Sequence, residues 1–197
     1  ECVQVITIVD TTAPVLNNLP EGEITVECDA VPAAAGVSIV DNCDENPTLV
    51  YIEVRFDGNC PGYYTLTRTW QAYDRCNNYT DTYEQTIHVQ DTTAPTFDSY
   101  EFYAHIECDQ IPALISASDN CGQATVIVVE EILNSGGCLG VLYRLYRATD
   151  ECGNSADAIQ YISIMDTTAP EFVGLPEENT VECSEVMLNN DGGVTGT

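Results

Sequence analysis

The sequence contains no lysine, and its five basic residues stand against 32 aspartate and glutamate residues. The resulting net charge of −27 over 197 residues excludes nucleic acid as a partner, because phosphate binding requires positive charge. The same charge disfavours anionic membrane surfaces, so we expect no direct membrane insertion by this chain. Two uses of the carboxylates remain open, a self-repelling, solubilising surface or groups that gather to bind hard cations.

Motifs of catalysis are also absent. There is no G-x-S-x-G turn, no nucleotide-binding glycine loop and no H-E-x-x-H pair. The adjacent Glu130 and Glu131 could in principle serve a glycosidase, but neighbours on a strand point to opposite faces of a sheet. The sequence therefore predicts a protein that is not an enzyme.

Histidine is scarce, with two residues, and none of the ten cysteines forms a C-x-x-C pair. Zinc is consequently a poor explanation of the cysteines. Their recurring spacing instead predicts disulfides that form in an oxidising compartment.

What the chain does contain is a repeat. The pentapeptide Asp-Thr-Thr-Ala-Pro begins at Asp10, Asp91 and Asp166, at intervals of 81 and 75 residues. The next cysteine follows each of these aspartates after 18, 17 and 17 residues. Fixed internal periods indicate one folding unit repeated along the chain. Stacked small modules usually serve length or display, which argues against a single active site.

The repeat divides the chain into two complete modules and two partial ones. Residues 10–90 form the first complete module and residues 91–165 the second. Residues 1–9 match the segments before the later motifs, so we expect them to be the last strand of a preceding module. Residues 166–197 begin a third module. We therefore expect the chain to be a piece of a longer protein.

Strand signals dominate each module, and no segment shows convincing helical periodicity. Short strands separated by frequent turns predict an all-β fold of tandem immunoglobulin-like β-sandwich repeats, disulfide-stapled and arranged as an extended array. The linker prolines limit φ at each junction and should stiffen it. The expected strands are Glu23–Glu27, Gly36–Val40, Thr48–Phe56, Tyr63–Tyr73 and Thr82–Val89, then His105–Glu107, Leu114–Ala117, Thr125–Leu133, Val141–Thr149 and Ala158–Ile164.

The sandwich topology also predicts how the cysteines pair. Cys43 and Cys76 fall in loops expected at the N-terminal end of the first module, and Cys28 and Cys60 in loops at its other end. Four cysteines allow three connectivities, so the pairing depends on this topology. We predict the pairs Cys28 with Cys60, Cys43 with Cys76, Cys108 with Cys138 and Cys121 with Cys152. Cys2 and Cys183 have no predicted partner.

Acidic loops recur at the expected N-terminal end of each module, beside its linker aspartate. Oxygen ligands from Asp and Asn side chains suit calcium, whereas the alternative is that these residues only form turns. The convergence of three segments on one junction favours a structural Ca²⁺ ion. Its expected ligands are Asp10, Asp41, Asn42 and Asp74 in the first module and Asp91, Asp119, Asn120 and Asp150 in the second, with Asp29 or Asp57 as further candidates.

Arg68 and Arg144 occupy equivalent positions, each two residues before an aromatic side chain. We expect a half-buried arginine that pairs with a carboxylate, and a ligand-binding arginine is the alternative. The candidate partners are Glu27 or Glu53 in the first module and Glu107 or Glu130 in the second.

Several linked motifs carry a family resemblance. T-V-E-C-D, D-N-C, T-R-T-W-Q-A-Y-D-x-C-N-N and I-x-V-Q-D-T-T-A-P resemble the HYR-like, immunoglobulin-fold repeats of giant surface adhesins of gliding Bacteroidota, the SprB-like family. The resemblance covers the whole chain. It implies export by the type IX system, an extracellular position at the cell surface, and movement along the cell during gliding. Cys2 fits a cysteine expected eight residues before the motif, but Tyr83 and Ala158 replace it in the complete modules.

The D-T-T sequence also resembles a short O-glycosylation motif of Bacteroidota. The residues expected to carry the glycan are Thr11, Thr92 and Thr167. The alternative is that each threonine only caps the turn.

Two functions from different classes follow. The first is a structural, non-catalytic stalk segment of an exported adhesin or filament, with the neighbouring repeats of the same chain as its partners. The second is a module that binds a glycan or another surface through exposed aromatic side chains, with Tyr63, Tyr79, Tyr100 and Tyr103 as candidates.

Overall fold

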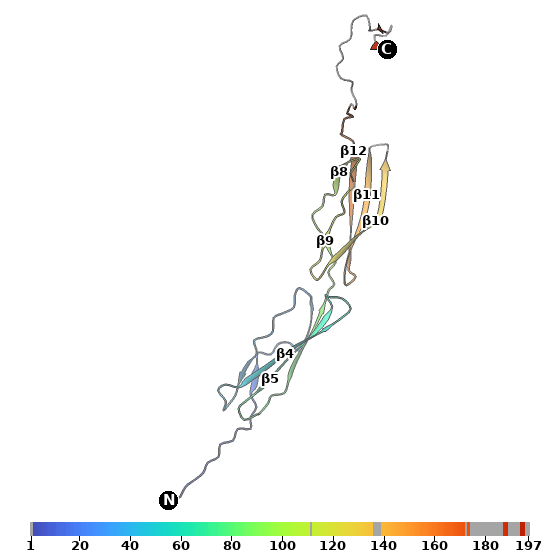
Figure 1. The fold of residues 1–197 in the computed structure, drawn as a ribbon. Coiled ribbons are helices and arrows are strands. Elements are labelled where there is room, and N and C mark those ends of the chain that lie inside the picture. The colour runs from blue at the N-terminus through green and yellow to red at the C-terminus, as the bar shows by residue number, and fades with distance from the viewer. Residues whose placement is uncertain are drawn as a thin grey trace. The chain divides into compact units, whose positions relative to one another are not determined.

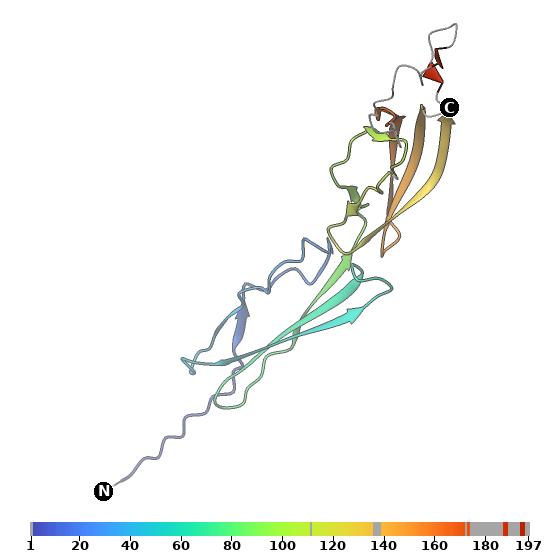
Figure 2. The ribbon, with the colours of Figure 1, turned by 45° about the horizontal axis from the view of Figure 1, so that its top comes forward.

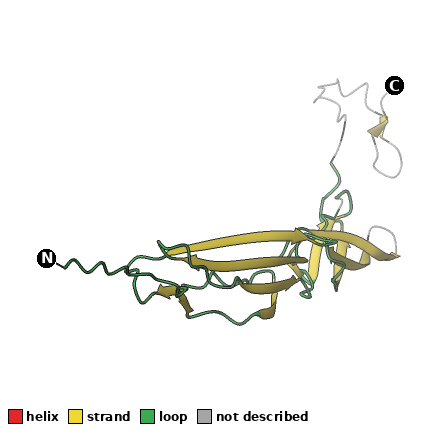
Figure 3. Cartoon of the chain, turned by 90° about the horizontal axis from the view of Figure 1, so that it is seen from below, coloured by secondary structure: helices red, strands yellow, loops and turns green. Residues whose placement is uncertain are grey.

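A computed structural model describes residues 2–110, 112–135, 139–171, 173, 187–188 and 194–195. The chain divides into two units, Glu1–Met165 and Asp166–Thr197. Strands and loops make up the described residues, with no helix among them (Figure 3). In this part of the chain, accordingly, no helix has the length and apolar character needed to span a membrane.

The first module consists of a four-stranded sheet and a two-stranded sheet (Figure 1). The larger sheet has the order β2-β6-β5-β4, in which β2 runs parallel to β6 and the other neighbours are antiparallel. The smaller sheet pairs β1 with β3. The strands are β1 Val15–Asn17, β2 Glu23–Glu27, β3 Ser38–Val40, β4 Thr48–Asp57, β5 Tyr64–Tyr73 and β6 Tyr83–Gln90.

The second module repeats this topology strand for strand. Its sheets have the orders β8-β12-β11-β10 and β7-β9, and β8 again runs parallel to β12 (Figures 1 and 2). The prediction of an all-β chain of tandem sandwiches is confirmed. The strands are β7 Thr96–Phe97, β8 Tyr103–Glu107, β9 Ala117–Ser118, β10 Ala124–Ser135, β11 Gly140–Asp150 and β12 Ser155–Met165.

The expected long strands are present, but short ones differ. β1 and β7 were not expected, because two or three residues are too few to show an alternating pattern. The strand expected at Leu114–Ala117 is reduced to Ala117–Ser118. Residues 2–9, expected as a strand, form none and are exposed. Asp166–Thr197 contributes only the short pair β13 Met187–Leu188 and β14 Val194–Thr195 to the described residues.

The core of the first module lies on one face of β5 and β6. Every second residue of β5 from Leu66 onward is buried, as expected for a strand with one face packed. Trp70, only 1% exposed, packs near the rings of Tyr51 and Tyr83, at centroid distances of 5.3 and 6.3 Å. In the second module Tyr146 occupies the position that corresponds to Trp70.

Arg68 is a structural residue, as expected. Its Nε donates to Glu53 Oε2 at 2.7 Å. Its other nitrogens donate to the carbonyl oxygens of Pro32 at 2.9 Å and Ala33 at 3.3 Å. The side chain therefore ties the sheet to the loop after β2.

Arg144 makes the same kind of contacts, but the predicted partner Glu130 is wrong. Arg144 donates to Glu131 and to the carbonyl oxygen of Pro112. The reason is a β-bulge, which shifts the register between Val128 and Glu130 and places Glu131 opposite Arg144. In the regular β4–β5 pair, Glu53 lies opposite Arg68 without such a shift.

Replacing Arg68 with methionine should lower the free energy of unfolding by about 3 kcal/mol, because it leaves two carbonyl oxygens and Glu53 without their donor. The matched variant Glu53→Gln should cost less than about 1 kcal/mol, since the Glu53 side chain is 40% exposed and glutamine still accepts a hydrogen bond. Urea unfolding followed by the fluorescence of Trp70, the only tryptophan, reports on the first module. Equal losses in the two variants would contradict the structural role of Arg68.

Candidate functional site: the acidic, disulfide-linked junction

Two disulfides join the first module to the second. Cys28 bonds to Cys121 and Cys60 bonds to Cys152, with Cα–Cα distances of 5.8 and 5.2 Å. Cys28 follows β2 and Cys60 lies in the β4–β5 turn, whereas Cys121 and Cys152 lie in the β9–β10 and β11–β12 turns. Each disulfide thus crosses the junction at a different turn.

The predicted pairs Cys28 with Cys60 and Cys121 with Cys152 are wrong. The prediction placed each cysteine at the correct end of its module, but it paired cysteines that share an end. At the junction those two ends face each other, so each cysteine meets one from the other module.

The other two predicted pairs have different outcomes. Cys43 and Cys76 carry free, exposed thiols and do not bond to each other, so that pair is wrong as well. The predicted pair of Cys108 with Cys138 is not decided, because Cys138 lies outside the described residues, as does Cys183.

The β4–β5 turn fits closely against the second module. Gly62 is buried, and a Cβ atom there would lie 2.6 Å from Asp91 Cβ and 3.2 Å from Cys121 Cβ. Glycine is therefore required for this close approach. The linker itself is also held to the first module. Glu27 accepts hydrogen bonds from the amide of the linker residue Thr92 at 3.1 Å and from its hydroxyl at 2.6 Å.

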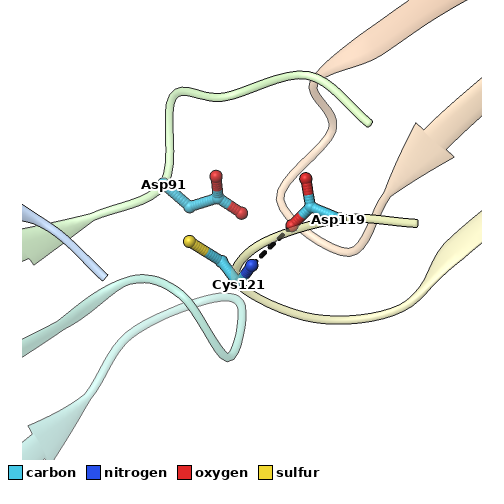
Figure 4. Close-up of side chains that lie close together, drawn as sticks. All are labelled: Asp91, Asp119 and Cys121. Carbon is cyan, nitrogen blue, oxygen red and sulfur yellow. Dashed lines mark hydrogen bonds between the residues drawn. The ribbon is translucent and has the colours of Figure 1, made fainter. Parts of the chain in front are cut away.

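Carboxylates gather at the N-terminal end of both modules. Oxygens of Asp10, Asp41 and Asp74 lie within 4.8 Å of one another. In the second module, oxygens of Asp91 and Asp119 lie equally close, together with the sulfur of Cys121 (Figure 4). That sulfur belongs to a disulfide and supplies no thiolate ligand.

Each aspartate uses one oxygen to form its turn. Asp41 Oδ1 accepts the Cys43 amide at 2.9 Å, and Asp119 Oδ1 accepts the Cys121 amide at 2.8 Å, a contact drawn in Figure 4. The turn-forming role considered from the sequence is thus real. The second oxygen differs: Asp41 Oδ2 and Asp119 Oδ2 are buried and have no hydrogen-bond partner among the described residues. Such atoms require an explanation, since buried polar groups are almost always paired.

The charges at the junction affect one another. Burial raises the pKa of Asp91, and the neighbouring charges of Asp119, Asp150 and Glu27 raise it further. Burial opposes ionisation of Asp74 as well, but hydrogen bonds from Asn78 and from the Cys76 amide together outweigh it and hold the pKa of Asp74 below its ordinary value. Ionisation of Asp91 is therefore less favourable than that of an exposed aspartate, and a nearby cation would offset this.

Five of the six predicted aspartate ligands belong to the two clusters, whereas Asp150 does not. Both oxygens of Asp150 accept hydrogen bonds from Asn154, the second at 2.8 Å from its side chain. Asn42 is exposed and donates to the Cys43 sulfur at 3.3 Å. Asn120 lines a hollow of about 440 Å³ together with Asp119 and Asp29 of the first module. Asp57, by contrast, pairs with Arg55.

Two asparagines that the sequence analysis did not assign hold the clusters in place. Asn78 donates to the Asp10 carbonyl oxygen at 3.3 Å and to Asp74 Oδ2 at 2.6 Å. Asn154 donates in the same way to the Asp91 carbonyl oxygen at 3.1 Å. The recurrent spacing of four residues between the aspartate and the asparagine in both modules is the signal that could have identified them.

One ion pair of the first module is absent from the corresponding place in the second. In the first, buried Asp44 accepts hydrogen bonds from the backbone and guanidinium of Arg75. In the second, the corresponding residues are Gly122 and Glu151, and Glu151 accepts the Gln123 amide at 3.4 Å. The two N-terminal ends therefore share their cysteines and aspartates but not this charge pair.

The predicted glycosylation residues lie in the linkers. Thr92 donates its hydroxyl proton to Glu27, and a glycan on that oxygen would remove the donor. Thr11 is exposed. Thr167 follows Asp166, which accepts the Thr168 amide in the same turn as in the other linkers. Modification of these residues stays a prediction.

The predicted surface aromatics do not form one patch. Tyr79 packs against Tyr73 and Tyr100 against Phe97, while Tyr63 lies exposed in the β4–β5 turn. The fourth predicted residue, Tyr103, belongs to a cluster on the second module. Its ring stacks on that of Tyr161, with ring centroids 5.7 Å apart. The remaining members of that cluster are Phe102 and Tyr143.

No family model matches the chain, and no curated protein matches it. Solved structures similar to it include human protocadherin-24 EC1-2, with 14% identity and a TM-score of 0.33 over 79% of this chain and all of that one. Drosophila N-cadherin EC1-4 has 15% identity and a TM-score of 0.31 over 79% of this chain and 51% of that one. The protocadherin GammaB4 extracellular domain has 15% identity and a TM-score of 0.34, over 91% and 37%. Similarity at this level establishes no function.

The variant Gly62→Ala should disturb the junction, because the added methyl group would overlap Asp91 and Cys121. We expect a loss of stability of about 1–3 kcal/mol, as for other overpacked sites. Peptide mapping under non-reducing conditions should show less of the Cys60 to Cys152 bond. Gly36→Ala is the matched control, since a Cβ atom at Gly36 would have no neighbour within 4 Å. Normal disulfide formation and stability in Gly62→Ala would show that the β4–β5 turn does not pack against Asp91 and Cys121.

Proposed function

We propose that this chain is a structural stalk segment of an exported, extracellular adhesin or filament, and that it carries no catalytic activity. The observation that carries the proposal is the pair of disulfides between the modules. A peptide linker alone would leave two small modules free to reorient. Two further covalent links at separate turns hold the junction at three points and resist both bending and twisting.

The compartment follows from the same bonds. Disulfides persist outside the cytosol, in oxidising environments. The strongly acidic surface keeps long chains apart and soluble, which suits a protein exposed on a cell. The sequence resemblance to repeats of gliding Bacteroidota adhesins supports type IX export and a role in gliding, and we include both in the proposal.

Calcium fits the acidic clusters. Calcium prefers several oxygen ligands, including carboxylates and carbonyls. The buried Oδ2 atoms of Asp41 and Asp119, which have no hydrogen-bond partner among the described residues, are free to serve as ligands. When bound, the ion would neutralise carboxylates whose mutual repulsion otherwise opposes a rigid junction. The residues that would hold it are Asp10, Asp41 and Asp74 in the first module and Asp91 and Asp119 in the second.

A glycan-binding role is the second candidate, and one observation favours it. Tyr103, Tyr161 and Tyr143 are neighbours across β8, β12 and β11 and so form a row on one sheet face. The corresponding row of the first module holds Glu23, Thr86 and Thr67, with no aromatic ring. Aromatic rings on an open surface suit stacking against sugars. Binding to a glycan array that Tyr103→Ala abolishes would support this role, and an array without any bound glycan would dispose of it.

The stalk proposal predicts that the two modules tumble as one body. Backbone ¹⁵N relaxation of the oxidised chain should give the same rotational correlation time for residues 10–90 and 91–165. A variant with serine at the four junction cysteines should give shorter times for both. The control variant Cys43→Ser/Cys76→Ser also removes two cysteines but leaves the junction intact, so its tumbling should match the unmodified chain. Independent tumbling in the oxidised chain would refute a rigid stalk.

Calcium should stabilise the folded chain, by about 2.7 kcal/mol at a free concentration one hundred times the dissociation constant. Asp119→Asn should lose most of the response of the second module, because asparagine keeps the turn-forming oxygen but replaces the unpaired, charged one. In chelator the variant should be as stable as the unmodified chain or more stable, since repulsion falls. Thermal unfolding with and without calcium measures both effects.

The control for this experiment is Glu23→Gln, which removes one exposed charge at the start of the edge strand β2, outside both acidic clusters, and should keep the full response to calcium. A melting temperature that calcium leaves unchanged in all three proteins would mean that the aspartates form turns only. The stalk would then depend on the disulfides and the linker.

A further inference from the structure

The N-terminal end of the first module repeats the end that the second module presents to the junction. Cys43 and Cys76 correspond to Cys121 and Cys152 in sequence and in place. The turn that carries Cys43 is held by Asp41 as that of Cys121 is held by Asp119. The linkers before the two modules also match, since each begins with the sequence Asp-Thr-Thr-Ala-Pro.

What differs is the occupancy of this end. In the second module both cysteines are bonded to the first module, and the β4–β5 turn lies against them. In the first module both cysteines are free and exposed. They border a hollow of about 260 Å³, which is also lined by Ile8, Asp10, Asp44 and Arg75.

We propose that this hollow is a docking face for the C-terminal end of another module of the same kind, secured by two disulfides. Cys43 would bond to the residue that corresponds to Cys28, and Cys76 to the one that corresponds to Cys60. The inference rests on the tandem-repeat arrangement of the proposed function. Repetition of the observed junction makes the array a continuous ladder of paired disulfides.

The chemistry of the docking face selects this partner. A partner needs two cysteines at the spacing of Cys28 and Cys60. It also needs a glycine where Gly62 packs against the next module, and a carboxylate that can accept a hydrogen bond from Thr11 as Glu27 does from Thr92. The first module's own C-terminal end has all of these features. The E-C-D and C-x-G sequences that supply them recur in the second module as Glu107-Cys108-Asp109 and Cys138-Leu139-Gly140.

One cation on this face can contact such a partner, beside the Asp44 carboxylate with which it already pairs. Arg75 is 72% exposed at the rim of the hollow. The C-terminal end that would face it is acidic, with Glu27, Asp29 and Asp57 in the first module.

Each new bond requires an oxidant. Two thiols lose two protons and two electrons to form one disulfide, and a disulfide donor such as oxidised glutathione takes them up by exchange, becoming two thiols. An oxidising compartment supplies donors of this class.

The test extends the chain by one module. A copy of residues 10–90, carrying Cys43→Ser and Cys76→Ser, replaces residues 1–9 directly before Asp10, and the protein is folded with oxidised and reduced glutathione. Non-reducing peptide mapping should find Cys28 linked to Cys43 and Cys60 linked to Cys76 as the predominant forms of Cys43 and Cys76. The 197-residue chain, which lacks the copy, should show neither pair.

Two results would overturn the proposal: a bond between Cys43 and Cys76, or free thiols at both positions. The bonds of Cys28 to Cys121 and Cys60 to Cys152 in the same digest show that the chain has folded, so either result can be interpreted. A chain that fails to respond to calcium or tumbles flexibly would weaken the proposed function, while this map would still decide the docking face.

Discussion

The contact between the β4–β5 turn of one module and the N-terminal loops of the next is the interaction on which the junction depends. It brings Cys60 to Cys152, places Gly62 against Asp91, and so holds Asp91 in a buried position. Burial is the largest cause of the raised pKa of Asp91. The covalent links and the electrostatics of the junction therefore have one geometric cause.

The acidic clusters and the disulfides contribute to the junction in different ways. A disulfide limits how far two turns can separate, largely independently of ionic conditions. Carboxylates at short range repel unless a cation lies among them, so their contribution depends on the surrounding ions. An array that contains both has a permanent connection and an adjustable stiffness.

The module and its two ends can be predicted from the sequence, but the junction cannot. Alternating patterns predicted the long strands, because β5 and β6 bury one face each. The position of Cys28 and Cys60 at one end, and of Cys43 and Cys76 at the other, also followed from strand order. The disulfide partners did not follow from strand order, because each partner lies in the neighbouring module and strand order within one module does not specify it. The prediction that Glu130 pairs with Arg144 was wrong for a local reason. A bulge of one residue has no clear signature in the sequence of a largely apolar strand.

The linked junction has a consequence for proteolysis. Cys28 and Cys60 precede the exposed Thr92 and Thr93, while Cys121 and Cys152 follow them. The linker is therefore one side of a closed covalent ring. A protease that cuts the backbone at these threonines opens the ring without releasing either half, and the two fragments stay connected for as long as the sulfur bonds remain oxidised.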